Sequence, residues 1–129
     1  MSLTVSLKHD SLVLTTVHLT GAILAATTPI LAEALKSKFE NRKCSLVFDL
    51  AHVSMNDSTG LCLIATTKKQ QAKENLGFGI IHAQPTVLKV FEIVKLTSHL
   101  NVFASQVELD SYLIGIQQKM MAEGEENSA

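Results

Sequence analysis

The polar stretch Asn56-Asp57-Ser58-Thr59-Gly60 separates two apolar segments, a strand-like run at Leu46–Leu50 and a helix-like run that begins at Leu61. Asp, Ser and Thr before an apolar run favour a helix N-terminus, because their side-chain oxygens accept hydrogen bonds from first-turn N–H groups. Gly60 permits a close approach of another backbone. Such a helix start carries about half a positive charge and can hold an anion or a phosphate group. From these residues alone, a plain helix cap is the favoured interpretation.

The composition indicates one domain, because 129 residues can bury roughly two thirds of the surface that the unfolded chain exposes. The formal net charge is −1 and there is no Trp, which argues against a nucleic-acid surface and favours a protein partner or a small ligand. No apolar run approaches the roughly 20 residues of a membrane span, and the N-terminus lacks a signal region. A soluble, cytoplasmic protein is therefore expected.

Metal and catalytic chemistry are not expected. Cys44 and Cys62 lie in apolar segments and are predicted to be buried free thiols. The histidines contain no i, i+4 pair and are interpreted as core or surface residues: His9, His18, His52, His82 and His99. Ser58 lacks the G-x-S-x-G context of a hydrolase nucleophile. We therefore predict a protein that is not an enzyme and that uses no cofactor.

The first half of the chain predicts a β-hairpin and a helix. Leu3–Leu7 alternates apolar and polar residues, His9–Ser11 is typical of a turn, and Leu12–Leu19 is a second β-rich segment. Thr28 as cap and Pro29 at the first helical position then predict a helix to about Asn41. Its apolar side is expected to consist of Leu31, Ala34, Leu35 and Phe39. The connecting run, Ala22–Ala26, is either a partner groove or a buried connection.

The second half predicts alternating strands and helices. Cys44–Leu50 is nearly continuous in apolar character, as in a strand that is covered on both faces. The helix after Ser58 is expected to stop near Asn75–Gly77, with Lys68, Lys69 and Lys73 on a solvated face. Two further strands are expected, Phe78–Ile81 and a weak strand Val102-Phe103. A helix from Pro85 is expected to place four residues on its inner side: Val87, Leu88, Phe91 and Val94. A last helix, Gln106–Met121, is expected to have five apolar residues: Val107, Leu109, Leu113, Ile114 and Ile116.

The resulting order is β-β-α-β-α-β-α-β-α, an α/β fold with a mixed, mostly parallel sheet and packed helices. Residues 1–121 are predicted to form this single domain, and residues 122–129 a disordered acidic tail. In open sheets of this kind, sites gather where strand C-terminal ends meet helix N-termini. Asn56–Gly60 is expected at such a place.

The segment around Asn56–Gly60 resembles the STAS domain, which is found in bacterial anti-sigma factor antagonists. The stretch Val47–Leu61 looks like the family signature, whose core is an Asp, a phosphorylatable Ser, then Ser or Thr, then Gly-Leu, here Asp57-Ser58-Thr59-Gly60-Leu61. The resemblance continues forward through Gln84-Pro85-Thr86-Val87 and Phe91 to Leu96, and backward to Thr20-Gly21. It covers about residues 4 to 116.

The resemblance implies a partner switch. In that family the unmodified antagonist binds an anti-sigma factor that is also a serine kinase, and so releases a sigma factor. Phosphorylation of the serine matching Ser58 breaks the complex, and a metal-dependent serine phosphatase restores it. The resemblance implies that partner binding involves Asn56, Asp57, Ser58, Thr59, Gly60 and Leu61, with no direct nucleic-acid or membrane contact. A monomer is expected for the isolated domain, because the short strand Val102-Phe103 and a hairpin edge leave little flat apolar edge for pairing.

Two features depart from the family pattern. Family members often carry acidic residues at the positions of Ala22 and Leu24, so the surface beside Ser58 is expected to be less acidic and more apolar. Lys95 stands where the family usually has a glycine before the leucine matching Leu96.

Three functions are alternatives to the anti-sigma factor antagonist: a STAS scaffold of the stressosome type, the small subunit of a lipid-transport ATPase complex, and a small-ligand or nucleotide sensor.

Overall fold

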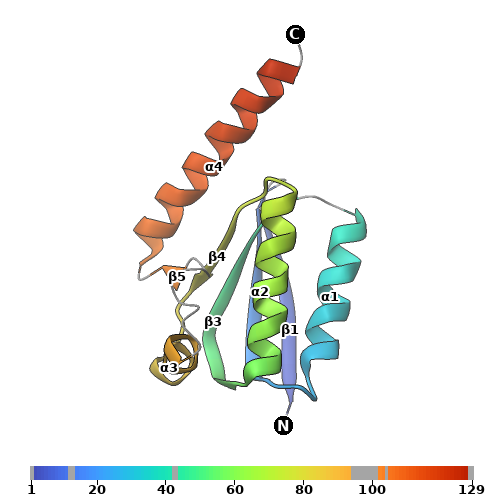
Figure 1. Ribbon diagram of the computed structural model, residues 1–129, viewed down its shortest axis with the longest axis vertical. Coiled ribbons are helices and arrows are strands. Elements are labelled where there is room, and N and C mark those ends of the chain that lie inside the picture. The colour runs from blue at the N-terminus through green and yellow to red at the C-terminus, as the bar shows by residue number, and fades with distance from the viewer. Residues whose placement is uncertain (1, 12–13, 42–43, 94–101, 104, 128–129) are drawn as a thin grey trace.

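A computed structural model of the 129-residue chain describes residues 2–11, 14–41, 44–93, 102–103 and 105–127. Within these residues five strands form one sheet in the order β1-β2-β3-β4-β5 (Figure 1). The strands β1 and β2 pair antiparallel, and every other neighbouring pair is parallel. The bounds are β1 Leu3–Ser11, β2 Leu14–Ile23, α1 Thr28–Asn41, β3 Ser45–Asn56, α2 Ser58–Lys73, β4 Phe78–Ile81, α3 Pro85–Ile93, β5 Val102–Phe103 and α4 Gln106–Asn127.

The predicted element order is confirmed, and so is the mixed, mostly parallel sheet. Parallel neighbours need a crossover connection, and here α1, α2 and α3 supply those connections between β2 and β5. The bounds of β4 and β5 and the start of α3 at Pro85 agree with the sequence prediction. Several predicted positions lie outside the described residues: Leu12, Val94, Lys95, Leu96 and His99.

The hairpin strands are longer than the sequence predicts. The strand β1 continues through the predicted turn to Ser11, and β2 continues past Leu19 to Ile23. Thr20-Gly21 does not end the strand, because Gly21 pairs with Leu3 on one side and Val53 on the other. Gly21 has a φ of 117°, and a Cβ there would meet the backbone oxygen of Ser2. Only glycine fits this backbone conformation without strain.

The predicted end of the third strand at Leu50 is wrong. The strand β3 runs to Asn56, because it keeps a pairing partner in β2 up to the pair Ile23 and Asn56. Two register irregularities, near Ala51 and near Ser54, disturb this pairing without ending it. The helix α2 starts at Ser58, three residues before the predicted start at Leu61. The polar break between strand and helix is therefore Asp57 alone.

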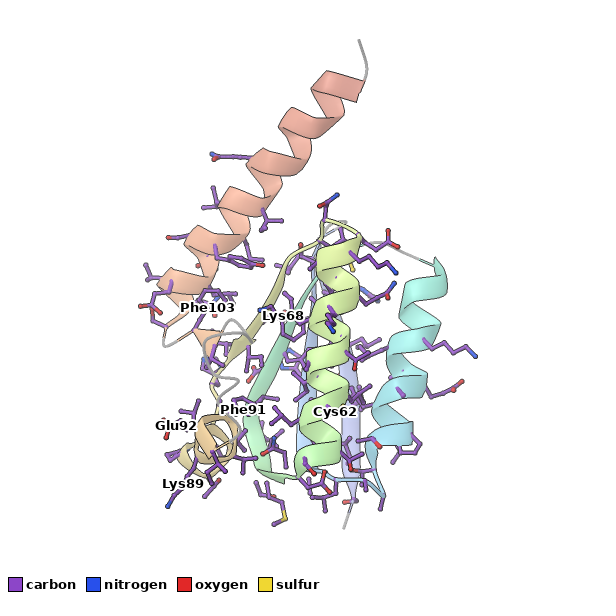
Figure 2. The ribbon with its side chains drawn as sticks, viewed as in Figure 1. Cys62, Lys68, Lys89, Phe91, Glu92 and Phe103 are labelled. Carbon is purple, nitrogen blue, oxygen red and sulfur yellow. The ribbon has the colours of Figure 1, made fainter. Side chains whose placement is uncertain are left out.

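Three helices cover one face of the sheet. The large buried cluster joins residues of β1 to β4 with residues of α1, α2 and α3, including Leu31, Leu61, Ile64, Val87 and Phe91. Figure 2 shows Phe91 between α3 and the sheet, with Lys89 and Glu92 on the outer side of that helix. Leu31 and Leu35 are buried as predicted, whereas the side chain of Phe39 lies outside the described ones. We call this side the covered face.

The other face meets only the first half of α4 within the described residues. A small buried cluster of Val47, Ile81 and Leu109 forms there, with Phe103 and Tyr112 packed against it. Val107 and Ile114, which the sequence places on the apolar side of α4, are 74% and 54% exposed. We call this side the open face, because β1 and β2 present partly exposed residues on it.

The helix α4 extends to Asn127, so residues 122–127 continue the helix where a disordered tail is predicted from charge and polarity. Ala122, Glu123, Glu125 and Glu126 are strong helix formers and allow this continuation. Figure 1 shows the helix projecting beyond the sheet. The division of the chain after residue 121 remains a prediction.

Candidate functional site

Asp57 joins β3 to α2 and is the N-cap of the helix. Its backbone is extended, with φ −113° and ψ −177°, and its Oδ1 accepts a hydrogen bond of 2.9 Å from the backbone N–H of Gly60. Its Oδ2 accepts a second bond of 3.0 Å from the backbone N–H of Ala25. The backbone N–H of Asp57 donates to the carbonyl of Ile23 at 3.2 Å. One aspartate therefore fixes the start of α2 to the β2–α1 connection.

The hydrogen bonds to Asp57 stabilise its ionised form. The N–H of Gly60 has the largest effect and the N–H of Ala25 the next, and together they lower the pKa of the carboxyl below its ordinary value of 3.8. The carboxylate is thus a fixed negative charge at the helix start, which opposes part of the helix dipole.

Gly60 allows the helix start to lie against the end of β2. A Cβ at this position would come within 2.4 Å of the carbonyl oxygen of Ile23 and 2.7 Å of its Cγ2 atom. Both distances are too short for real contacts, so any side chain here would push α2 away from β2. The role predicted for Gly60, a close backbone approach, is confirmed.

Ser58 is exposed at the first position of α2. Asp57 supplies the capping oxygen, so the hydroxyl of Ser58 is not needed as a cap, and it makes no hydrogen bond with the part of the chain that the structure describes. Thr59 is exposed beside it. The plain-cap interpretation therefore applies to Asp57 and not to Ser58.

The other predicted partner-binding residues are buried. Gly60 and Leu61 lie under the helix start, and Asn56 is 7% exposed with no hydrogen-bond partner in the described residues for either side-chain polar atom. These three residues shape the site from below. Of the six predicted partner-binding residues, Ser58 and Thr59 are therefore exposed and Asp57 is half-buried. The other three are buried beneath them: Asn56, Gly60 and Leu61.

Exposed apolar residues lie on the segments that meet at the start of α2. Met55 and Ile30 are 41% and 48% exposed, and Ala25 and Ala26 are exposed on the connection held by Asp57. Ala22 is buried in β2, which makes the predicted run Ala22–Ala26 part strand and part surface. Met55 and Ile30 are absent from the predicted site, because only the fold brings the end of β3 close to the segment that precedes α1.

The prediction that both cysteines are buried is wrong for Cys62. Cys62 is exposed on α2 (Figure 2). Cys44 is buried, and its Sγ atom lies 3.3 Å from the Oγ1 atom of Thr15. Cys62 lies in the apolar run Leu61–Ala65, but only Leu61 and Ile64 of that run are buried. Cys62 lies four residues after Ser58 and so lies on the same side of the helix. The spacing of four residues from Ser58 is the feature of the sequence that could have predicted the exposure of Cys62.

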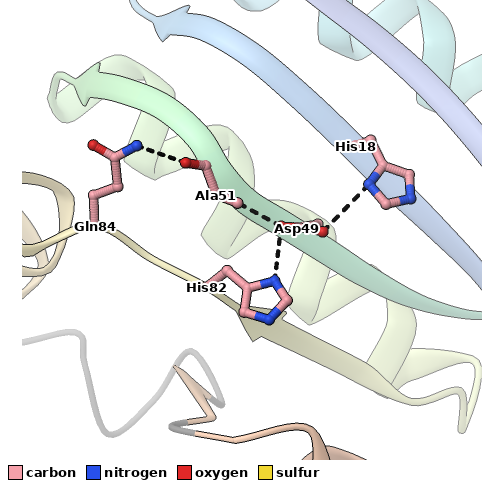
Figure 3. Close-up of polar contacts among 5 residues, drawn as sticks. All are labelled: His18, Asp49, Ala51, His82 and Gln84. Atoms are coloured by element: carbon pink, nitrogen blue, oxygen red, sulfur yellow. Dashed lines mark hydrogen bonds and ion pairs between the residues drawn. The ribbon is translucent and has the colours of Figure 1, made fainter.

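Two histidines that are distant in the sequence share one carboxylate. Figure 3 shows His18 of β2 and His82, which follows β4, on either side of Asp49 of β3. The Nδ1 atoms lie 3.3 Å and 3.2 Å from the two carboxylate oxygens. Within the described residues, no group of three or more His, Cys, Asp or Glu could hold a metal ion. In the same residues, no helix is both long enough and apolar enough to cross a membrane.

The family model of the STAS domain matches residues 4–109. The chain belongs to the STAS domain family. The resemblance carried by Val47–Leu61 is thereby confirmed, and Asp57 to Leu61 are the residues of this STAS domain that form the helix start. No curated protein matches the chain.

Solved structures confirm the fold. An anti-sigma factor antagonist from Mycobacterium paratuberculosis has 25% sequence identity and a TM-score of 0.73, over 89% of this chain and 94% of that chain. The anti-sigma factor antagonist SpoIIAA in its unphosphorylated form has 19% identity and a TM-score of 0.70, over 87% and 97% of the two chains. The phosphorylated form of SpoIIAA from Bacillus has 16% identity and a TM-score of 0.62, over 84% and 98%.

The same fold also occurs inside a much larger protein. The murine anion transporter Slc26a9 has 18% identity and a TM-score of 0.60, over 81% of this chain but 18% of that chain. The similarity to anti-sigma factor antagonists supports the same general role for this STAS domain.

Proposed function

We propose that this STAS domain is a cytoplasmic anti-sigma factor antagonist of a partner-switching pathway. The unphosphorylated form binds an anti-sigma factor that is also a serine kinase, and so releases a sigma factor. Phosphorylation of Ser58 breaks that complex, and a serine phosphatase restores it. The domain acts by binding and not by catalysis, and it is a monomer when alone.

The observation that carries the proposal is the exposed hydroxyl of Ser58 at the first position of α2, next to a cap that does not need it. A phosphoserine adds about −1.5 to −2 charges at neutral pH. The helix N-terminus accommodates negative charge, by about 0.3–1 kcal/mol at an exposed position. Asp57 keeps its two backbone hydrogen bonds, so phosphorylation leaves the fold in place.

The energetic cost of phosphorylation then falls on the partner interface. A like charge within about 4 Å costs roughly 4 kcal/mol at an effective dielectric near 20, which is close to three orders of magnitude in affinity. The apolar residues around Ser58, Met55 and Ile30 among them, add the cost of placing a charge against a surface that would otherwise be buried by the partner.

The test compares Ser58→Ala and Ser58→Glu with wild type in calorimetry against the anti-sigma factor. We expect Ser58→Ala to bind, Ser58→Glu to bind at least tenfold more weakly, and both to melt within a few degrees of wild type. Gln70→Glu is the matched control and should bind as wild type does, because Gln70 is exposed on the same helix about three turns from Ser58. Unchanged affinity of Ser58→Glu, or a melting temperature far below wild type, would contradict the switch.

The site itself is tested by intact-mass spectrometry after incubation with the kinase and ATP. We expect a single phosphate on wild type and none on Ser58→Ala. Labelling that survives Ser58→Ala would move the site, with Thr59 as the next residue to replace.

A second candidate is a STAS module of a scaffold or a transport complex. The similarity to a segment of an anion transporter favours it, because it places this fold in a transport protein. A neighbouring gene for a small serine kinase or phosphatase supports the switch, whereas neighbouring transporter genes support the module. A dimer that persists on dilution in light scattering would favour the scaffold.

A further inference from the structure

A groove of about 370 Å³ lies between α1 and α2, which run side by side over the covered face (Figure 1). On the α1 side it is lined by Ala32, Leu35 and Lys36. Leu35 and Lys36 follow Ala32 by three and four residues, so the lining is one side of that helix. We call this hollow the helix groove. It is distinct from the Ser58 site, because none of the residues from Asn56 to Leu61 lines it.

The α2 side of the helix groove is a regular helical stripe. Leu63 is followed by Thr66, Thr67 and Gln70, at spacings of three, four and seven residues. At a rise of 1.5 Å per residue, this stripe is about 10 Å long. The groove therefore offers contact along about two turns of a helix.

The hydroxyl groups of the groove already have partners. Thr66 donates from Oγ1 to the carbonyl oxygen of Cys62 at 2.8 Å, and Thr67 donates from Oγ1 to that of Leu63 at 2.8 Å. Both hydroxyl protons are thus bonded within α2, so an occupant gains no hydrogen-bond donor from them. Lys36 and Gln70 are the remaining polar side chains of the lining. The groove can therefore hold an occupant mainly by burial of apolar surface.

The walls of the groove limit the shape of an occupant. Both walls are helices, whose backbone groups are bonded within each helix, so neither wall offers the free N–H and C=O groups of a strand edge. An extended peptide cannot pair with such walls. An amphipathic helix satisfies its own backbone and places apolar side chains into a groove at spacings of three, four and seven residues. The two turns of the groove match that spacing.

The charge beside the groove is positive. Lys36 is its one charged lining residue among those that the structure describes. Lys69 and Lys73 follow Thr66 by three and seven residues, so they lie on the same side of α2, and both are exposed. An occupant of the groove therefore meets lysines from both helices.

Acidic residues do not cancel this charge. Among the described side chains of α1, α2 and the C-cap of α2, four lysines stand against two glutamates: Lys36, Lys68, Lys69 and Lys73 against Glu33 and Glu74. The whole chain has a formal net charge of −1. Positive charge is therefore concentrated on the two helices that form the groove.

The chain has a second hollow, a cavity of about 330 Å³ on the open face, between the sheet and the first half of α4. Its lining mixes both signs of charge, with Lys8 beside Asp49 and Asp110. Such a lining does not select a partner of one charge. The helix groove does, because its surroundings favour carboxylates over ammonium groups.

We propose that the helix groove binds an acidic amphipathic helix of a second partner protein, distinct from the anti-sigma factor at Ser58. The apolar side of that helix packs on Leu35 and Leu63. Its carboxylates lie near Lys36, Lys69 and Lys73. A contact of two helical turns is a small interface, so the isolated partner helix binds weakly and reversibly.

The test titrates two model peptides of about 18 residues, long enough to form a helix in water, into the full chain. Both carry leucine at every third or fourth position, and the remaining positions combine alanine with glutamate in the acidic peptide and with lysine in the basic peptide. NMR follows the methyl groups of Leu35, Leu63 and Thr66. We expect saturable shifts with the acidic peptide and at least tenfold weaker binding of the basic peptide. Equal or tighter binding of the basic peptide, or no saturable shift of these methyl groups, would overturn the proposal.

One pair of variants on α2 separates the groove from the rest of the helix. Thr66→Glu places a carboxylate in the groove at an exposed position, and we expect it to weaken binding of the acidic peptide by about tenfold or more. Ala72→Glu is the matched control, because Ala72 is exposed on another side of α2 and does not line the groove. Its affinity should stay within about twofold of wild type.

A second pair separates the groove from the net charge of the protein. Lys36→Glu reverses the charge in the lining and is expected to weaken binding of the acidic peptide by about tenfold. Lys89→Glu makes the same change of net charge on the outer side of α3 and should leave the affinity within about twofold (Figure 2). Equal losses within either pair would contradict the proposal.

The same resonances report on another occupant. Shifts of Leu35 and Leu63 that depend on protein concentration without any peptide would assign the groove to a second copy of the chain, and so overturn the proposal. Ser58→Ala is expected to bind the acidic peptide as wild type does. The helix groove can therefore fail this test while the Ser58 switch stands, and the reverse also holds.

Discussion

The two faces of the sheet differ in how their residues are used. On the covered face, residues of four strands and three helices form one continuous apolar cluster, and α2 presents Ser58 at its end. On the open face, Val47 and Ile81 of the sheet pack against Leu109 of α4, and Asp49 contacts two histidines. Many more apolar side chains are buried on the covered face than on the open face, so we expect the covered face to contribute most of the free energy of folding.

The largest expected effect compares the same substitution on the two faces. Leu46→Ala removes a fully buried side chain of the large cluster and is expected to destabilise the protein by about 3–5 kcal/mol. Leu109→Ala removes a side chain of the small cluster and should cost about 2 kcal/mol, because α4 can relax toward the cavity. Urea denaturation measures both values. Equal costs would show that the open face contributes as much stability as the covered face.

A second comparison concerns how tightly each side packs its helix. Gly60→Ala places a methyl group against the carbonyl of Ile23, so we expect a loss of about 1–3 kcal/mol and weaker partner binding. Gly115→Ala in α4 meets no atom within 4 Å and should stabilise the protein by about 0.5–1 kcal/mol, the difference in helix propensity. Thermal unfolding reports both changes. A neutral Gly60→Ala would mean that α2 can move away from β2 without penalty.

The smallest expected effect is the pH dependence of the helix cap. The folded-state pKa of Asp57 is lowered below its ordinary value of 3.8, so its contribution to stability is present above that value and is lost as the pH falls through the lower, folded-state pKa. Asp57→Asn removes this contribution. We expect wild type to exceed the variant in stability at pH 6, and the gap to shrink toward pH 3. A gap that stays constant in denaturant titrations across this range would contradict the role of the charge.

Local signals in the sequence were sufficient where short-range chemistry decides the structure. Pro85 starts α3, Phe78–Ile81 forms β4, and the polar residues before Leu61 mark the start of a helix. They could not distinguish which of these residues is the cap, because Asp, Ser and Thr are all suitable. The bond from Ala25 to Asp57, across 32 residues, made Asp57 the cap and left Ser58 exposed.

The remaining differences have the same physical origin. The strand β3 continues to Asn56 because β2 lies beside it and pairs with its backbone, and Cys62 is exposed because α2 meets the sheet on its other side. Neither fact is a property of the local sequence. The exposed surface around Ser58, with Met55 and Ile30, likewise comes from elements that are distant in the chain.

The sequence by itself determined the order of the elements and the mixed sheet, and it placed Ser58 beside a helix start, because periodicity, turn residues and helix caps act over a few residues. The resemblance of Val47–Leu61 to a family signature identified the STAS domain. The tertiary structure alone decided that His18, Asp49 and His82 lie together on the open face. Their meeting depends on the parallel register of β2, β3 and β4, in which His18 pairs with Asp49 and Asp49 with Ile81. That register is set by packing across the whole sheet, since backbone pairing by itself allows many registers and burial of one face selects among them.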